Sequence, residues 1–285
     1  MQRTSFRLAA VLAAGALALS ACGSDDGDSG DDGDGTGAGG GSGDGITIGI
    51  KFDQPGLGLK DGNEYTGMDV DVARAVAEKL GFSEDQITFV ESPSAQRETM
   101  LQAGQVDLIF ATYSITDSRK ESVQFAGPYF VAGQDLLVAQ DSDIAGPADL
   151  DGKILCSVTG STSAENVKAE VPGVQLQEYG TYSECVEQLS NGTIDAVTTD
   201  DVILAGFAAQ EAYAGKLKVV GAPFSTENYG VGLNQDDDRC EDVNAALTEL
   251  WEEGTMEQII DDNVGAAGFT PNPETNPAEA GGHCA

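Results

Sequence analysis

Apolar and polar positions alternate along the chain in a pattern that predicts strands and helices in turn from residue 46 onward. Short apolar runs at Ile46–Lys51, Val106–Thr112 and Lys153–Val158 have the length and composition of buried strands. A helix is predicted from about Ser163, and another at 243–260 with Trp251. One apolar helical face after the first run is formed by Met68, Val72, Ala73, Val76 and Leu80. This order of elements predicts an α/β fold.

An internal repeat in the sequence indicates that the alternating α/β unit occurs twice. A helix-like stretch at 96–101 leads into a Gly-x-Val-Asp turn and the strand ending near Thr112, and a similar series recurs 88 positions later. The matching pairs are Leu101 with Leu189, Asp107 with Asp195, and Thr112 with Asp200. The repeated order predicts two similar α/β lobes. Because ligands bind beyond the carboxyl ends of strands in such sheets, we expect Thr112 and Asp200 to face one cleft.

The N-terminus resembles a lipoprotein signal peptide. Arg3 and Arg7 precede an apolar run at 8–19 that is too short to span a membrane, and small residues lead to Cys22. We expect residues 1–21 to be removed and Cys22 to carry lipid, which would hold the exported protein to the outer face of the cytoplasmic membrane. An ordinary secretory signal with a chance cysteine is the alternative. Residues 22–45 form a linker rich in Gly and Asp that has nothing to bury.

The chain is strongly acidic, with a formal net charge of −34 from 48 acidic and 14 basic residues. This charge argues against nucleic acid and anionic membrane surfaces as partners. Removing residues 1–21 takes away two arginines and no acids. Basic side chains are therefore scarce, so a basic residue at a motif position is explained more readily by function than by chance.

Cysteine and histidine usage favours disulfides over metal or catalytic chemistry. Once Cys22 is lipidated, four cysteines remain, and an even number in an exported protein indicates disulfides. Of three possible pairings we favour Cys156–Cys185, within one predicted lobe, and Cys240–Cys284, which would fix the tail. No CxxC pair exists and the only histidine is His283, so we expect no metal and no cofactor.

The same scarcity of histidine favours a binding protein over an enzyme. No Ser-His-Asp or Cys-His set can be built from the body of the chain, and zinc-hydrolase and phosphate-binding glycine motifs are absent. Catalysis by a pair of carboxylates remains an alternative, because acidic residues occur throughout the sequence.

The stretch from Ala111 to Arg119 carries the clearest functional signal. Thr116 has the features of a helix N-cap, which places Arg119 in the first helical turn. A cation is unfavourable there, since the free N–H groups and the helix dipole attract anions. A bound carboxylate would remove the conflict, held by Arg119, N–H groups and the hydroxyls of Thr112 and Ser114. The alternative is an exposed helical arginine.

This stretch resembles the polar amino-acid family (family 3) of solute receptors that serve ABC importers, and the similarity extends over roughly 46–264. The resemblance implies a two-lobed, type II periplasmic-binding-protein fold, in which each lobe has a mixed sheet flanked by helices and a hinge joins the lobes. It places the first lobe at 46–132 and 228–268, the second at 133–227, and a tail at 269–285.

The resemblance also implies a ligand set. Arg119, with Thr112, Ser114 and Thr162, would hold the α-carboxylate of an amino acid, and Asp200 would accept its ammonium group. Lys51 and Arg97 match basic positions of glutamate/aspartate receptors, where they meet the distal carboxylate. Tyr179 aligns with a histidine of some acidic-amino-acid receptors. Gln54 or Phe52 would replace an aromatic residue that often stacks on the ligand.

We therefore expect a monomeric receptor that binds L-glutamate, with aspartate as a second candidate ligand, and delivers it to the membrane subunits of an ABC permease. Three alternatives remain from the sequence. The first is a receptor for glutamine, asparagine or another polar amino acid. The second is a dehydratase-type enzyme on the same scaffold, and the third is a module of a sensor system.

Overall fold

The computed structural model describes residues 45–285. The predicted signal peptide at 1–21, the predicted lipidation site at Cys22 and nearly all of the predicted linker lie outside these residues. Within the described part, no helix is long and apolar enough to cross a membrane. The first strand, β1, begins immediately at Ile46.

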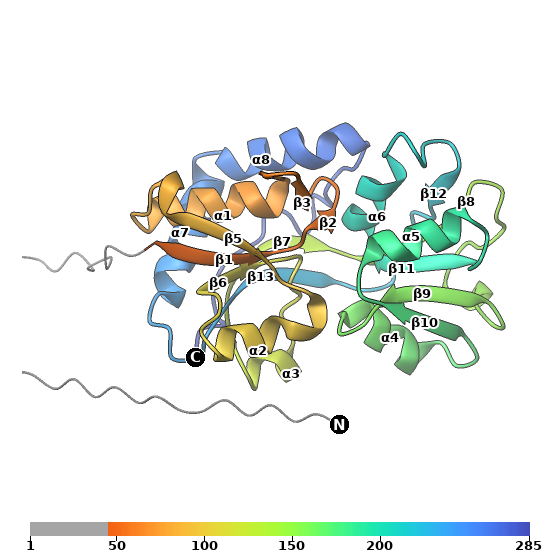
Figure 1. The fold of residues 1–285 in the computed structure, drawn as a ribbon, viewed down its shortest axis with the longest axis horizontal. Coiled ribbons are helices and arrows are strands. Elements are labelled where there is room, and N and C mark those ends of the chain that lie inside the picture. The colour runs from red at the N-terminus through yellow and green to blue at the C-terminus, as the bar shows by residue number, and fades with distance from the viewer. Residues whose placement is uncertain (1–44) are drawn as a thin grey trace, which may run out of the picture. The chain divides into compact units, whose positions relative to one another are not determined.

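One five-stranded sheet has the order β5-β1-β6-β13-β7, in which β13 is antiparallel to both of its neighbours and β1 is parallel to both of its own. Helices surround it (Figure 1). The strands are β1 (Ile46–Ile50), β5 (Ile87–Glu91), β6 (Leu108–Phe110), β7 (Gln124–Ala132) and β13 (Glu227–Leu233). The helices are α1 (Met68–Lys79), α2 (Arg97–Gln102), α3 (Asp117–Lys120), α7 (Cys240–Glu252) and α8 (Thr255–Val264).

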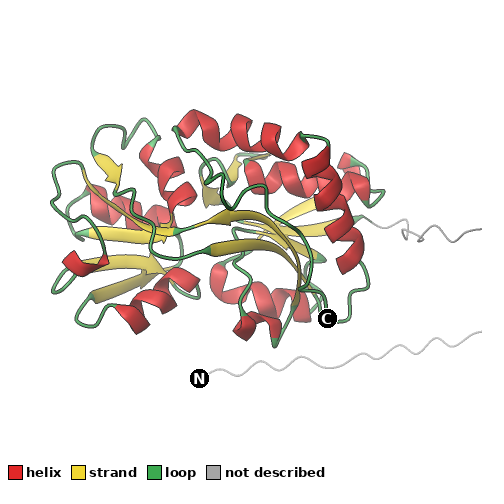
Figure 2. Cartoon of the chain, turned by 180° about the vertical axis from the view of Figure 1, so that it is seen from behind, coloured by secondary structure: helices red, strands yellow, loops and turns green. Residues whose placement is uncertain are grey.

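A second five-stranded sheet has the order β10-β9-β11-β8-β12. Figure 2 shows both groups of strands from behind, each flanked by helices. The strands are β8 (Gln134–Ala139), β9 (Ile154–Val158), β10 (Gln175–Tyr179), β11 (Ala196–Asp200) and β12 (Leu217–Val219), and the helices are α4 (Thr162–Glu170), α5 (Tyr182–Ser190) and α6 (Asp201–Ala208). Short 3₁₀ turns lie at Glu84–Gln86, Ser94–Gln96, Pro147–Asp149 and Gly265–Ala267.

A small antiparallel sheet follows β1 and consists of β2 (Asp53–Gln54), β3 (Gly58–Asp61) and β4 (Glu64–Thr66). It leads into α1, whose predicted apolar face is buried at Met68, Val72, Ala73 and Val76. Continuous apolar strands such as β6 are buried completely, as expected for a strand covered on both faces.

The predicted fold class is confirmed: two mixed sheets, each flanked by helices, account for most of the described chain. The backbone leaves the first sheet where β7 ends at Ala132, enters the second where β8 begins at Gln134, and returns where β13 begins at Glu227. These crossings support the proposed lobes at 46–132 with 228–268, and at 133–227.

The internal sequence repeat corresponds to one hydrogen-bond arrangement that occurs in both sheets. Asp107 Oδ2 accepts from the backbone N–H of Thr47 on β1 at 2.8 Å, and Asp195 Oδ2 accepts from that of Ile154 on β9 at 2.8 Å. In each lobe the aspartate therefore ties the turn before a buried strand to the start of the parallel strand beside it, β1 in the first lobe and β9 in the second.

The predicted helix at 243–260 is wrong in one respect. The segment forms two helices, α7 and α8, separated at Gly254, whose φ of 78° lies in the left-handed region. Glycine adopts this conformation without steric penalty, so it ends one helix and redirects the chain into the next.

The structure contains both favoured disulfides, Cys156–Cys185 and Cys240–Cys284. The second joins the start of α7 to the tail, which lies along the edge strand β7. There the side chain of Asn276 bonds both the N–H and the C=O of Val131, and Gly281 donates to the carbonyl of Gly127. The tail thus covers strand atoms that would otherwise form an open sheet edge.

Candidate functional site

Arg119 lies where the sequence places it, at the start of α3. Thr116 caps this helix, since its hydroxyl accepts from the N–H of Arg119 at 3.2 Å. The side chain is 9% exposed. Its guanidinium donates to the carbonyls of Ser114 at 2.7 Å and Gly160 at 3.1 Å, and Nε lies 3.4 Å from Glu98 Oε1. Of five guanidinium N–H groups, these contacts leave two for a further acceptor.

The opposing surface at Arg119 comes from the second sheet's α4. Ser161 caps α4 and Thr162 begins it, and the Thr162 hydroxyl lies 3.4 Å from that of Ser114. A cavity of about 520 Å³ at this junction is lined by residues that include Ser94, Glu98, Arg119, Gly160 and Thr162. Hydroxyls, a helix start and a guanidinium here form a group suited to a carboxylate.

Thr112 lies beside this group in an unusual backbone conformation, with φ at 45°. Asp69 fixes it: Oδ2 accepts from the N–H of Thr112 at 2.9 Å, and Oδ1 accepts from the hydroxyl of Tyr129 at 2.8 Å. Burial raises the pKa of Asp69 to about 6. The Thr112 hydroxyl donates to the carbonyl of Ala111 at 2.7 Å, so Thr112 shapes the strand end and offers no free donor here.

Asp200 ends β11 and is 3% exposed. Its Oδ2 accepts from the hydroxyl of Tyr229 at 2.6 Å, while Oδ1 is buried without a partner. Burial, followed by the nearby charge of Glu227, raises the pKa of Asp200 well above its usual value. A buried carboxylate oxygen without a hydrogen bond is unfavourable, so the position favours a cationic ligand group.

Lys51 and Arg97 lie together on the first sheet's side of the site. Lys51 Nζ donates to Ser94 Oγ at 3.2 Å, and Arg97 donates from Nη1 to the carbonyl of Ala111 at 3.0 Å. The two residues are 3% and 2% exposed. Burial lowers the pKa of Lys51 to about 8, and burial together with Arg119 lowers that of Arg97 to about 10. Within residues 45–285 neither cation forms an ion pair.

Sequence reasoning missed Tyr113. Its ring centroid lies 4.1 Å from the guanidinium carbon of Arg97 and 4.9 Å from that of Arg119, distances typical of cation–π contacts. The residue is fully buried next to the strand β6 and therefore resembles an ordinary core position in the apolar pattern. The signal available in the sequence was its position between Thr112 and Ser114, which are both candidate ligand-binding residues.

Tyr179 and Gln54 have different surroundings. The hydroxyl of Tyr179 lies 3.4 Å from Gln177 Oε1 on the same strand, and this contact does not connect it with the other candidate residues. Gln54 is fully buried, with Oε1 3.3 Å from the Thr112 hydroxyl and with Nε2 lacking a partner. Gln54 thus offers a buried amide donor close to the strand end.

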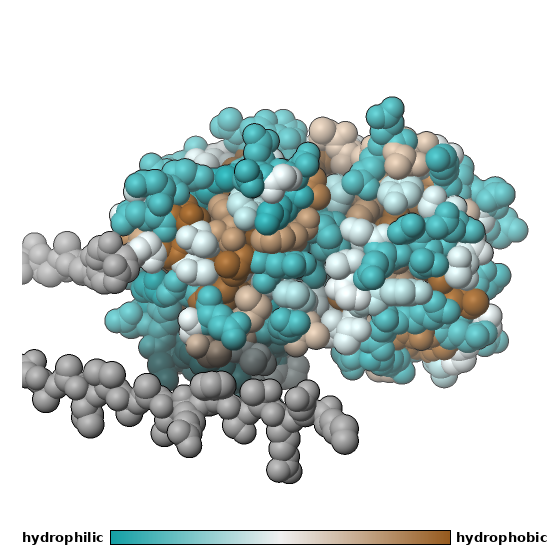
Figure 3. All heavy atoms as spheres, in the orientation of Figure 1, coloured by the Kyte–Doolittle hydropathy of each residue, from teal (hydrophilic) through white to brown (hydrophobic). Residues whose placement is uncertain are grey.

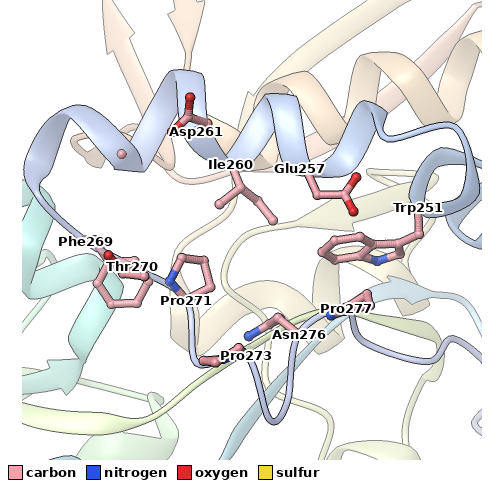
Figure 4. Close-up of a pocket in the computed structure, with 11 residues that line it drawn as sticks. Trp251, Glu257, Ile260, Asp261, Phe269, Thr270, Pro271, Pro273, Asn276 and Pro277 are labelled. Carbon is pink, nitrogen blue, oxygen red and sulfur yellow. The ribbon is translucent and has the colours of Figure 1, made fainter.

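A separate cavity of about 420 Å³ lies between α8 and the tail (Figure 4). Trp251, Ile260 and Phe269 line it together with prolines of the tail. Its charged lining residues are Glu257 and Asp261, so it offers no cation for a carboxylate. The cavity at Arg119, which offers a cation and hydroxyl groups, suits an amino-acid zwitterion better than the cavity at the tail does.

Comparison with known proteins gives a consistent result. The family model for bacterial extracellular solute-binding proteins, family 3, matches residues 46–266. A protein of Corynebacterium glutamicum named glutamate-binding protein GluB is 49% identical over 280 residues, which cover 93% of this chain and 92% of that protein. A Bacillus subtilis protein named ABC transporter glutamine-binding protein GlnH is 35% identical over 75% of this chain and 79% of its own length.

A solved structure described as an ancestral arginine-binding protein bound to glutamine superposes with a TM-score of 0.72. It is 34% identical, and the match covers 77% of this chain and 97% of that one. This similarity supports the two-lobed arrangement inferred from the two sheets.

Proposed function

Because the chain belongs to family 3 of the bacterial extracellular solute-binding proteins, we propose that it is the receptor of an ABC importer and binds L-glutamate between its two lobes. The observation that carries the choice of ligand is the pair Lys51 and Arg97. Two buried cations without an acidic partner are strongly unfavourable, and the distal carboxylate of glutamate would neutralise them.

The α-amino-acid group would bind at the polar residues contributed by both lobes. Arg119, Ser114 and Thr162 would hold the α-carboxylate, and the unpaired Oδ1 of Asp200 would accept from the ammonium group. Thr112 would support this group through its backbone, while the contacts of Tyr179 give no support to a direct role.

Other ligands fit less well. Glutamine would fill the same length but leave the charge of Lys51 and Arg97 unbalanced, although one relative is named for glutamine. Aspartate carries the right charge and is shorter by one methylene. Such a difference usually changes the binding free energy by a few kcal/mol at most. Nothing in the site supports a dehydratase, and the relatives are named as binding proteins.

We also propose that residues 1–21 are a lipoprotein signal peptide, that Cys22 is lipidated, and that the receptor acts at the outer face of the membrane with the permease subunits of its importer. The support for the anchor comes from the sequence alone. Export agrees with membership of an extracellular family.

Thermal unfolding of the chain from Gly23 onward, alone and with each of the twenty amino acids, tests the function. Ligand at 100 times its dissociation constant adds about 2.7 kcal/mol, which raises the midpoint by roughly 5–10 °C for a chain of this size. We expect the largest shift with glutamate, a smaller one with aspartate and little with glutamine. A shift with glutamine alone would contradict the role of Lys51 and Arg97, and no shift at all would contradict the proposed function.

A further inference from the structure

The segment around β2, from Asp53 to Pro55, belongs to the small sheet of the first lobe but packs against two helices of the second. Asp53 Oδ2 accepts from the backbone N–H groups of Tyr182 at 2.9 Å and Ser183 at 3.2 Å, and the Ser183 hydroxyl lies 3.3 Å from the same oxygen. These two N–H groups belong to the first turn of α5 and have no partner within the helix.

Asp53 completes the N-terminus of α5 from across the cleft. Within α5, Thr181 accepts from the N–H of Glu184, the third helical position, and so leaves the first two N–H groups free. A carboxylate at this place is favoured by both the hydrogen bonds and the helix dipole. The first lobe therefore supplies an acceptor for the two N–H groups that the helix's own capping box, formed by Thr181 and Glu184, leaves free.

A second contact lies two residues further along the segment. The backbone carbonyl of Pro55 approaches Gly206 in α6 so closely that a Cβ placed on Gly206 would lie 2.1 Å from the oxygen. No side chain is compatible with that approach. A glycine within a helix is otherwise unfavourable by about 1 kcal/mol relative to alanine, so its presence here calls for a packing reason.

Between the two contacts lies Gln54, fully buried, with its side chain at the Thr112 end of the site. We propose that Asp53–Pro55 is a closing segment, which docks on α5 and α6 when the lobes meet and thereby sets ligand affinity without contacting the ligand through Asp53 or Gly206. This inference rests on the proposed closure around an amino acid.

Two variants separate the closing segment from direct effects on the site. Asp53→Ala removes the cap, but Asp53 also raises the pKa of the nearby Lys51, so a change in affinity alone is ambiguous. Gly206→Ala carries no charge, and it should keep or increase stability without ligand because alanine is the better helix former. Asp61→Ala, an exposed aspartate of the same small sheet, is the matched control.

The first readout is glutamate affinity by calorimetry. Gly206→Ala should weaken binding by roughly 5- to 150-fold, the range for forcing a methyl group into a packed contact, with an unchanged or higher thermal midpoint of the free protein. Asp61→Ala should bind as the wild type does. Wild-type affinity in a folded Gly206→Ala protein would overturn the proposal.

The second readout is amide hydrogen exchange at the start of α5, which reports the contacts of Asp53 directly and does not depend on a measured affinity. In the wild type with glutamate, the Tyr182 and Ser183 amides should be protected, and Asp53→Ala should remove this protection while the Glu184 amide is unaffected. In a protein that binds glutamate, absent protection at Tyr182 and Ser183, or equal protection with and without glutamate, would overturn the closing segment. Protection that Asp53→Ala removes in a protein that binds no amino acid would instead contradict the proposed function and leave the segment standing.

Discussion

Lys51 and Arg97 converge on the same residue, Ser94. The ammonium group of Lys51 donates to the Ser94 hydroxyl at 3.2 Å, and Nε of Arg97 lies 3.4 Å from the Ser94 carbonyl. Two buried positive charges are thus held by neutral acceptors only. Such an arrangement is stable when an anion completes it, and this requirement is the basis of the first two predictions.

Replacing Arg97 with glutamine should weaken glutamate binding by roughly 10- to 150-fold, the equivalent of a hydrogen bond to a charged group at 1.5–3 kcal/mol. Binding of glutamine should change much less, because its side-chain amide carries no charge. Calorimetry with both ligands measures the difference. Arg74→Gln, on the surface beside Glu84, is the control. Equal losses for both ligands would place Arg97 outside the side-chain pocket.

Glutamate affinity should fall as the pH rises above about 8. Burial holds the pKa of Lys51 near 8 in the free protein, so below this pH the side chain is charged and ready to meet a carboxylate. Above it, binding must take up a proton, and affinity decreases by up to about tenfold per pH unit. Titrations with glutamate and glutamine from pH 6.5 to 9.5 measure this, since the ratio of the two affinities cancels titration of the ligand's amine. A ratio that does not vary with pH, in the wild type as in Lys51→Met, would contradict this role.

Arg119→Ala should weaken glutamate binding by about 3–5 kcal/mol, because it leaves the bound α-carboxylate without its charged partner. The effect should be similar for every amino acid that binds, since all share this group. Arg119→Lys keeps the charge and loses the planar fork, so it should restore only part of the affinity. The neighbouring Lys120, paired with Asp117 on the surface, provides the control Lys120→Ala. Binding within threefold of wild type would exclude Arg119 from the ligand site.

The parts of the fold that were predicted correctly rest on local patterns. The repeat between 96–112 and 185–200 revealed the two lobes because a helix, a turn and a strand recur in the same order and spacing, which a sequence displays directly. The cap at Thr116 was also readable, since it links residues three apart. Such features need no knowledge of what packs against them.

The features that were missed depend on long-range packing. Asp53 reaches an α5 residue 129 positions away, and no periodicity links the two. Tyr113 and Asp69 are buried side chains whose polar partners become visible only when the strands and helices are assembled. The break between α7 and α8 was missed because the apolar pattern continues through Gly254.

Removing the tail disulfide with Cys240→Ser and Cys284→Ser should lower stability by about 4 kcal/mol in the chain-entropy model, for cysteines 44 residues apart. The expected decrease in the thermal midpoint is roughly 8–16 °C. Glutamate affinity should not change, because neither cysteine lies at the candidate site. Scanning calorimetry and a binding titration on the same sample test both statements. A variant of unchanged midpoint would show that this disulfide contributes little to stability.

Asp200→Asn should weaken the binding of amino acids and spare a dicarboxylate that lacks the amine. The pKa of Asp200 is raised by burial and by Glu227, so the free carboxyl group is more readily protonated than usual. An ammonium ligand needs the ionised form, and affinity for glutamate should therefore fall as the pH decreases through this raised pKa. Asparagine resembles the protonated acid at every pH, so the variant should bind glutamate weakly and lose this acid-side dependence.

Glutarate has the same two carboxylates without the ammonium group, and its affinity should be unchanged or higher in the variant. Parallel titrations with glutamate and glutarate from pH 4.5 to 7.5 decide the matter, and an equal loss for both ligands would show that Asp200 acts on the pocket's structure and does not bind the ammonium group.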